Sequence, residues 1–325
     1  MHRYTRRQVV AAIALAACVS IWPAKAATFP SKPIRIVVPF GAGGVADLTA
    51  RTVAQKLQES LGLPVIVDNK PGAGGVVAGE AVAKAEPDGH TLLLMSNGTA
   101  VSAGLFKSLP FDAQRDFAPV STLGYFDLAL LVTPTAPYKT LPELLAYAKA
   151  NPGKLNVGTI NIGSTQHLAA ELFKARAGVD FQIVPFNGTP ALTAALRGVQ
   201  VDVAVEILGP MMGQISTKTL RPLAILGDER APQLPEVPTV MQSGVANFDV
   251  SSWNALAAPA KTPKDVIARL NKEVQAALAN PEVKKKLFDL NVQAKGSTPE
   301  KLSELLSTEI KRWSEVIVQA KVPRL

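Results

Sequence analysis

The segment that decides the fold is a strand, a glycine-rich turn and a helix near the start of the chain. Residues 34–61 read IRIVVPFGAGGVADLTARTVAQKLQESL. The β-branched run 34–38 predicts a buried strand that ends at Pro39, and the following residues predict a helix over about 45–61. The glycines between them allow the sharp turn that connects strand and helix. This unit is typical of an α/β fold.

The same alternation continues along the chain. Helices are expected between further strands at 65–67, 91–95, 155–157, 181–184, 201–205 and 223–226. Apolar runs of this length, spaced by helical segments, are typical of parallel sheets covered on both faces. The length of 325 residues favours two domains. Since no low-complexity linker is present, strands or short segments that can hinge are expected to join them.

The N-terminus predicts export. Basic residues, an uncharged apolar stretch and a small-residue cleavage pattern follow one another: Arg3, Arg6 and Arg7, then residues 9–22, then Ala24-Lys25-Ala26. That order is typical of a secretory signal peptide over 1–26, and the apolar stretch is shorter than the roughly 20 residues of a membrane helix. Cleavage after Ala26 and a periplasmic location are therefore expected.

Two features of this segment leave alternatives open. Thr5-Arg6-Arg7-Gln8-Val9-Val10 resembles a twin-arginine signal, so either export route is compatible with the sequence. Leu15-Ala16-Ala17-Cys18 reads as a lipoprotein box, which would leave a lipid anchor on Cys18, but the apolar run continues past it. The favoured cleavage removes Cys18, the single cysteine, and with it any disulfide, thiol nucleophile or cysteine metal site.

Charge and composition exclude several classes of function. The net charge of +8 falls to +4 without the four basic residues of 1–26. The remaining basic residues form no stripe with interleaved aromatic residues, so no nucleic-acid partner is expected. His90 and His167 belong to no HExxH motif, and no G-x-S-x-G motif occurs. We therefore expect no enzymatic activity, no metal and no cofactor.

The loop at residues 40–47 offers an anion site. Its glycines let the backbone approach a ligand, and the free N–H groups and dipole of the following helix favour a carboxylate or a phosphate. Residues 158–168 repeat the arrangement in the second half of the chain, with Ser164 as a natural N-cap. Two such loops, one in each half, indicate an anion held between two lobes.

The first loop also permits a different interpretation. Gly41, Gly43 and Ala46 satisfy a G-x-G-x-x-A pattern, and Asp68 ends the next strand, as in a dinucleotide-binding enzyme. Export away from nicotinamide cofactors, the proline at the end of the strand and a second glycine cluster at 72–75 weaken it. An exported Rossmann-like enzyme is thus a distant alternative.

Motifs along the whole expected mature chain carry a family resemblance. They occur in the same order and at consistent spacing: Pro30–Arg35, Val38-Pro39-Phe40 leading to Gly43-Gly44, Asn69–Gly75, Pro87–Leu93, Asp116–Val120, Ala150–Leu155, Ser164–Leu168, Gln200-Val201-Asp202, Leu234–Thr239 and Ser251-Ser252-Trp253. With these motifs the chain resembles the Bug-type, TctC-like extracytoplasmic receptors of tripartite tricarboxylate transporters.

The resemblance implies a type II periplasmic binding protein fold, with two α/β lobes and a ligand cleft between them. Lobe 1 is expected to comprise 27–128 plus 250–325, and lobe 2 to comprise 129–249. The β–α loops of both lobes are expected to hold a ligand carboxylate through these residues: Phe40, Gly43, Gly44, Val45, Ala46, Asp47, Ser96, Asn97, Thr99, Thr159, Asn161, Ser164, Thr165, Gln166, His167 and Glu206.

Departures from the family pattern leave the ligand open. A hydroxyl common in the first loop is absent at Val45-Ala46, and the segment 185–190 lacks a basic residue. Trp253-Asn254-Ala255 replaces a common Trp-Tyr-Gly, and Glu206 is longer than the acid common at that place. Family ligands include amino acids, di- and tricarboxylates and aromatic carboxylates.

The predicted function is capture of a small carboxylated metabolite and its delivery to a membrane permease. A monomer is expected. The principal alternative is a receptor of the same fold used for sensing, in which closure signals to a membrane kinase or regulator.

Overall fold

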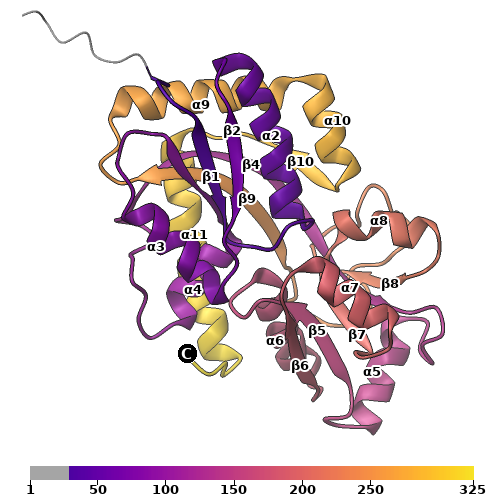
Figure 1. Ribbon diagram of the computed structural model, residues 1–325. Helices are drawn as coiled ribbons and strands as arrows, with labels where there is room; N and C mark the ends of the chain where they lie inside the picture. Colours follow the sequence, from indigo (N-terminus) through magenta and orange to yellow (C-terminus); the bar gives the residue numbers. More distant parts are fainter. Residues whose placement is uncertain (1–28) are drawn as a thin grey trace, which may run out of the picture.

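The computed structural model describes residues 29–325 and shows two lobes (Figure 1). The expected signal peptide over 1–26 and the lipid anchor at Cys18 lie outside the described residues. Within 29–325, no helix combines the length and the apolar character that crossing a membrane requires.

Lobe 1 begins with three strand–helix units. Their elements are β1 (Ile34–Val38), α2 (Val45–Leu61), β2 (Val65–Asn69), the short 3₁₀ helix η1 (Ala73–Gly75), α3 (Val76–Ala83), β3 (Thr91–Ser96) and α4 (Asn97–Leu105). Strand β1 is parallel to both β2 and β3. Four of the five β1 residues are fully buried, as the β-branched run predicted.

The C-terminal part of the chain returns to complete lobe 1. It supplies β9 (Ser251–Pro259), α9 (Lys264–Ala279), α10 (Pro281–Asp289), β10 (Val292–Ala294) and α11 (Pro299–Gln319). Helix α11 packs on α4, and the buried Trp313 donates its indole N–H to Asn97 Oδ1 at 2.7 Å. The two ends of the described chain thus share one core.

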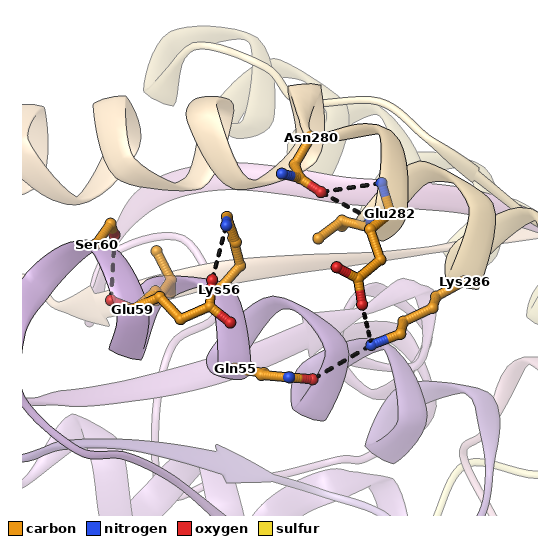
Figure 2. A network of polar contacts seen from close by, with 9 residues as sticks. Gln55, Lys56, Glu59, Ser60, Asn280, Glu282 and Lys286 are labelled. Carbon is orange, nitrogen blue, oxygen red and sulfur yellow. Dashed lines mark hydrogen bonds and ion pairs between the residues drawn. The ribbon is translucent and has the colours of Figure 1, made fainter.

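Helix α10 also contacts α2 through polar side chains. Lys286 Nζ lies 2.9 Å from a carboxylate oxygen of Glu282 and 3.4 Å from Gln55 Oε1 (Figure 2). The neighbouring Lys285 pairs with Asp289 at 2.7 Å. The basic run at 284–286 is therefore a solvated face paired with local carboxylates.

Lobe 2 contains the middle of the chain. Its elements are α5 (Leu141–Ala150), β5 (Asn156–Ile160), α6 (Thr165–Ala177), β6 (Gln182–Phe186), α7 (Thr189–Arg197), β7 (Val203–Ile207), α8 (Leu208–Ser216) and β8 (Arg221–Ile225). Strand β5 is parallel to β6 and β7. The strand order across both lobes is β2-β1-β3-β9-β4-β7-β5-β6.

A single long strand, β4 (Phe117–Val132), runs through both lobes (Figure 1). Up to Asp127 it pairs with β9, and from Leu128 onward it pairs with β7 and β8. Every one of these pairings is antiparallel. This change of pairing partner lies next to the expected lobe boundary between residues 128 and 129. That boundary and the second expected boundary, between residues 249 and 250, stay predictions.

The antiparallel strands β4 and β9 correct the expectation of purely parallel sheets. Parallel pairing holds for β1, β2 and β3 in lobe 1 and for β5, β6 and β7 in lobe 2. Pro119 and Gly124 conceal β4 in the sequence because both weaken strand patterns. The register of β4 against β9 shifts near each of them, which accommodates both residues within the sheet.

Candidate ligand-binding site

Several helix N-termini converge on one cavity between the lobes. Helix α2 contributes Gly44, Val45 and Ala46, α6 contributes Thr165 and Gln166, and α7 contributes the segment 188–189. The volume open to the centre of a water molecule is about 20 Å³. The first N–H groups of each helix have no intrahelical partner, so this cavity collects hydrogen-bond donors and positive dipole ends.

The start of α2 leaves its donors free because glycine caps it. Gly44 makes no side-chain capping bond. Asp47 instead accepts hydrogen bonds from Gly43 N and from Arg51 Nε, both at 3.0 Å. Burial alone would raise the pKa of Asp47, but the bonds from Arg51 and Gly43 hold it below its usual value. Asp47 thus braces the turn as a carboxylate.

The start of α6 is capped by Ser164. Its hydroxyl accepts from His167 N and donates to Ile160 O, each at 3.1 Å, and the residue is 1% exposed. This bond fixes the first turn of α6, from which Thr165 and Gln166 reach the cavity. Ser164 therefore acts on the cavity by positioning the helix.

Gln166 is held in turn by Glu206. Gln166 Nε2 donates to Glu206 Oε1 at 2.7 Å, and Ile207 N donates to the same oxygen at 2.7 Å. Glu206 is 0% exposed, and burial raises its pKa to about 7. Glu206 does not line the cavity; it supports the side chain that does.

Two polar contacts join the lobes near the cavity. Gly74 N of lobe 1 donates to Ile162 O of lobe 2 at 2.8 Å, and Thr165 Oγ1 lies 3.1 Å from Ser252 Oγ. A space of about 20 Å³ holds about one water molecule. This space is too small for an organic ligand, so we expect the lobes to move apart when one enters.

A second, smaller cavity adjoins the first across Phe40 and Ser96, which line both. It is lined from lobe 2 by Asn161 and Ser164 and from lobe 1 by Thr99. Ser96 caps α4, with its Oγ accepting from Gly98 N at 3.1 Å and its own N–H donating to Thr99 Oγ1 at 3.2 Å. The turn after β3 thus faces the cleft.

Ten of the sixteen residues expected at the site line one of the two cavities: Phe40, Gly44, Val45, Ala46, Ser96, Thr99, Asn161, Ser164, Thr165 and Gln166. The other six line neither cavity: Gly43, Asp47, Asn97, Thr159, His167 and Glu206. Asn97 accepts from Trp313, and Thr159 is fully buried in β5. Burial lowers the pKa of His167 to about 4, which makes it a neutral side chain at neutral pH.

The sequence interpretation missed part of the lining. Phe126, Ser252 and Asn254 lie on the unpredicted strands β4 and β9. A threonine before a proline, as at Thr189-Pro190, is typical of a helix cap, but α7 has Gly188 as its N-cap. Gly188 has φ 94°, a backbone conformation that favours glycine. Thr189 then occupies the first helical position and lines the cavity.

The cavity lining carries no formal charge. Within 29–325, no Asp, Glu, Lys, Arg or His lines the larger cavity, and no group of three potential metal ligands occurs. Asp68, which the dinucleotide interpretation would place on a ribose, lies 3.7 Å from Arg35 and 3.6 Å from Lys70. Neutral donors at helix starts therefore define the site.

Fold and site together define a two-lobed solute-binding protein of the periplasmic type. The profile described as "Tripartite tricarboxylate transporter family receptor" matches residues 49–322, and the chain belongs to this family. Protein BugT of Bordetella pertussis (strain Tohama I) is 36% identical over 316 residues, covering 96% of this chain and 97% of BugT.

Two solved structures extend the comparison. R. palustris Rpa4515 with adipate has a TM-score of 0.88 and 31% identity, covering 91% of this chain and 100% of that one. MatC (Rpa3494) from Rhodopseudomonas palustris with bound malate has a TM-score of 0.83 and 34% identity, covering 89% and 100%. The predicted family and the type II binding fold are confirmed, and both are those of binding receptors.

Proposed function

We propose that this protein captures a small carboxylate between its lobes and delivers it to the permease of a tripartite tricarboxylate transporter. The proposal is supported above all by the convergence of the α2, α6 and α7 N-termini on one cavity between the lobes. Helix N-termini from both lobes can contact the same anion only when the lobes are closed around it. Anion binding and closure of the lobes are therefore coupled.

The ligand carboxylate lies against the uncapped start of α2. Gly44, Val45 and Ala46 offer backbone N–H groups there without a side chain that competes for them. Thr165 and Gln166 meet the ligand from lobe 2. Each hydrogen bond to a charged group contributes roughly 1.5–3 kcal/mol, so a few of them reach the roughly 8 kcal/mol of micromolar binding.

Adipate and malate, held by two relatives, make carboxylates the first ligands to test. The family pairs such receptors with permease subunits, and the closed state is the form that we expect the permease to recognise. The proposal includes export and a monomeric receptor, and it includes no catalytic step. A soluble mature chain beginning at Ala27 is the proposed form.

Native mass spectrometry of the protein, purified without added ligand, tests the proposal. We expect an additional mass that is lost on gentle activation and is identified as a carboxylic acid after extraction. Titration calorimetry with that acid should then show binding at micromolar concentration or tighter. A bound dinucleotide, or chemical conversion of the bound molecule, would refute the receptor function.

A further inference from the structure

Asn254 is a buried amide that faces the cavity with both polar atoms unpaired. It lies on the central strand β9, between Ser96 of β3 and Gly124 of β4. Its exposure is 0%, and among residues 29–325 neither Oδ1 nor Nδ2 has a hydrogen-bond partner. Burial of unpaired amide groups is costly, so native proteins rarely retain them without a partner.

The position of Asn254 in the sheet explains why it cannot find a partner elsewhere. Side chains alternate along a strand, so Asn254 and Ser252 share the face that lines the cavity. Strands β3 and β4 flank β9 on both sides, and Asn254 is 0% exposed, so its amide has no access to bulk solvent. The amide is therefore directed at whatever fills the cavity.

The chemistry of an amide specifies its complement. Nδ2 donates and Oδ1 accepts, so one ligand group satisfies both only if it can accept and donate, as a carboxamide or a hydroxyl can. A carboxylate only accepts, and it would leave Oδ1 facing a negative charge. Asn254 thus favours a neutral polar group over a second carboxylate.

The other residues that line the cavity also favour a neutral group over a second carboxylate. No cationic side chain within 29–325 lines the cavity to neutralise a second anion, while Phe126, Ile160 and Ile207 provide apolar walls. The buried carboxyl group of Glu206 lies directly behind Gln166. Its negative charge, where present, would further disfavour a dianion.

Resting on the proposed function, we infer that Asn254 makes this receptor selective for a monocarboxylate whose other end is a neutral group that both donates and accepts hydrogen bonds. The carboxylate binds at the helix starts, and the neutral group pairs with the Asn254 amide. This preference distinguishes the protein from a receptor for dicarboxylates.

Matched probes test the inference. Adipate and its monoamide adipamate share a carbon chain, as do terephthalate and terephthalamate, and each pair differs only in whether the second end is charged. By titration calorimetry, we expect the monoamide to bind at least about tenfold more tightly than its diacid, as two neutral hydrogen bonds imply. Equal or tighter binding of the diacid would overturn the inference and leave the receptor function intact.

Replacing Asn254 tests whether this residue causes the selectivity. Asn254→Leu removes both polar atoms at similar volume, and we expect it to reduce the preference for the monoamide to near unity. Asn156→Leu makes the same change at the far end of β5 from Ile160, about 13 Å along the strand, and should keep the preference. Retained preference in Asn254→Leu would overturn the assignment.

The ligand carried from the cell separates the two proposals. A co-purified monocarboxylate with a hydroxyl or amide supports both, whereas a co-purified dicarboxylate overturns the selectivity and supports the receptor. A non-carboxylate ligand, together with no binding of any of the four probes, would overturn both. The wild-type comparison requires no variant, so misfolding of Asn254→Leu leaves the test valid.

Discussion

The buried carboxyl group of Glu206 makes stability depend on pH with a defined sign. Burial raises its pKa from 4.5 to about 7, against the bonds from Gln166 and Ile207 that lower it. The folded state therefore binds this proton more tightly than the unfolded state does. The resulting stabilisation is fully present below pH 4.5 and is lost as the pH rises to about 7. Since a tenfold change in proton affinity corresponds to about 1.4 kcal/mol, the loss is about 3 kcal/mol.

Glu206→Gln removes the titration and keeps the geometry. Its Oε1 can still accept from Gln166 Nε2 and Ile207 N, as the glutamate oxygen does. We expect the free energy of unfolding of the variant, relative to the parent, to increase by about 3 kcal/mol between pH 4.5 and pH 7.5. Urea denaturation at half-unit pH steps measures this difference.

The matched control is Glu304→Gln on the exposed face of α11. Its difference from the parent should stay constant over the same pH range. A flat profile for Glu206→Gln would show that the fold does not raise the pKa of Glu206. A decrease with rising pH would contradict the sign of the argument.

Three further variants address the same site. Burial lowers the pKa of His167 to about 4, so the neutral imidazole contributes to stability above pH 6.5 and this contribution is lost as the pH falls. We therefore expect urea denaturation to show a smaller loss of stability for His167→Phe than for the parent between pH 6.5 and pH 4.5. In Gly44→Val, the added Cβ would lie 3.1 Å from Thr189 Oγ1, so we expect calorimetric affinity for the co-purified ligand to fall at least about tenfold at an unchanged melting temperature. Ser164→Ala removes the cap of α6 and should lower the free energy of unfolding by about 1 kcal/mol, and an unchanged value would argue against the capping role.

Local signals allowed much of each lobe to be predicted. The strand and helix expected over 34–61 coincide with β1 and α2, because a β-branched run, a glycine turn and the C-cap Gly62 mark their limits within a few residues. Thr140 and Thr298 cap α5 and α11, each with a proline in the first helical turn, which is a local sequence signal of a helix start. Such signals need no knowledge of the distant parts of the chain.

The strands that join the lobes could not be predicted in this way. Pro119 and Gly124 interrupt β4, and the alanine-rich β9 lacks the β-branched residues typical of strands. Long-range pairing stabilises both strands despite their weak strand composition: β4 pairs with β9 at residues far apart in sequence, from 117 with 259 to 127 with 251. Tertiary packing determines these two elements.

The site residues that the sequence did not predict lie on the strands that it did not predict. Loop motifs located the donors at the starts of α2 and α6 because a strand, a glycine turn and a helix are consecutive in sequence. Phe126, Ser252 and Asn254 line the cavity because β4 and β9, which pair over a long range, border it together with those helix starts. A loop that binds any carboxylate can be recognised locally, whereas the choice among carboxylates depends on side chains brought in by long-range pairing. The proposal of anion binding could therefore be made from the sequence, whereas the selectivity proposed for Asn254 required the structure.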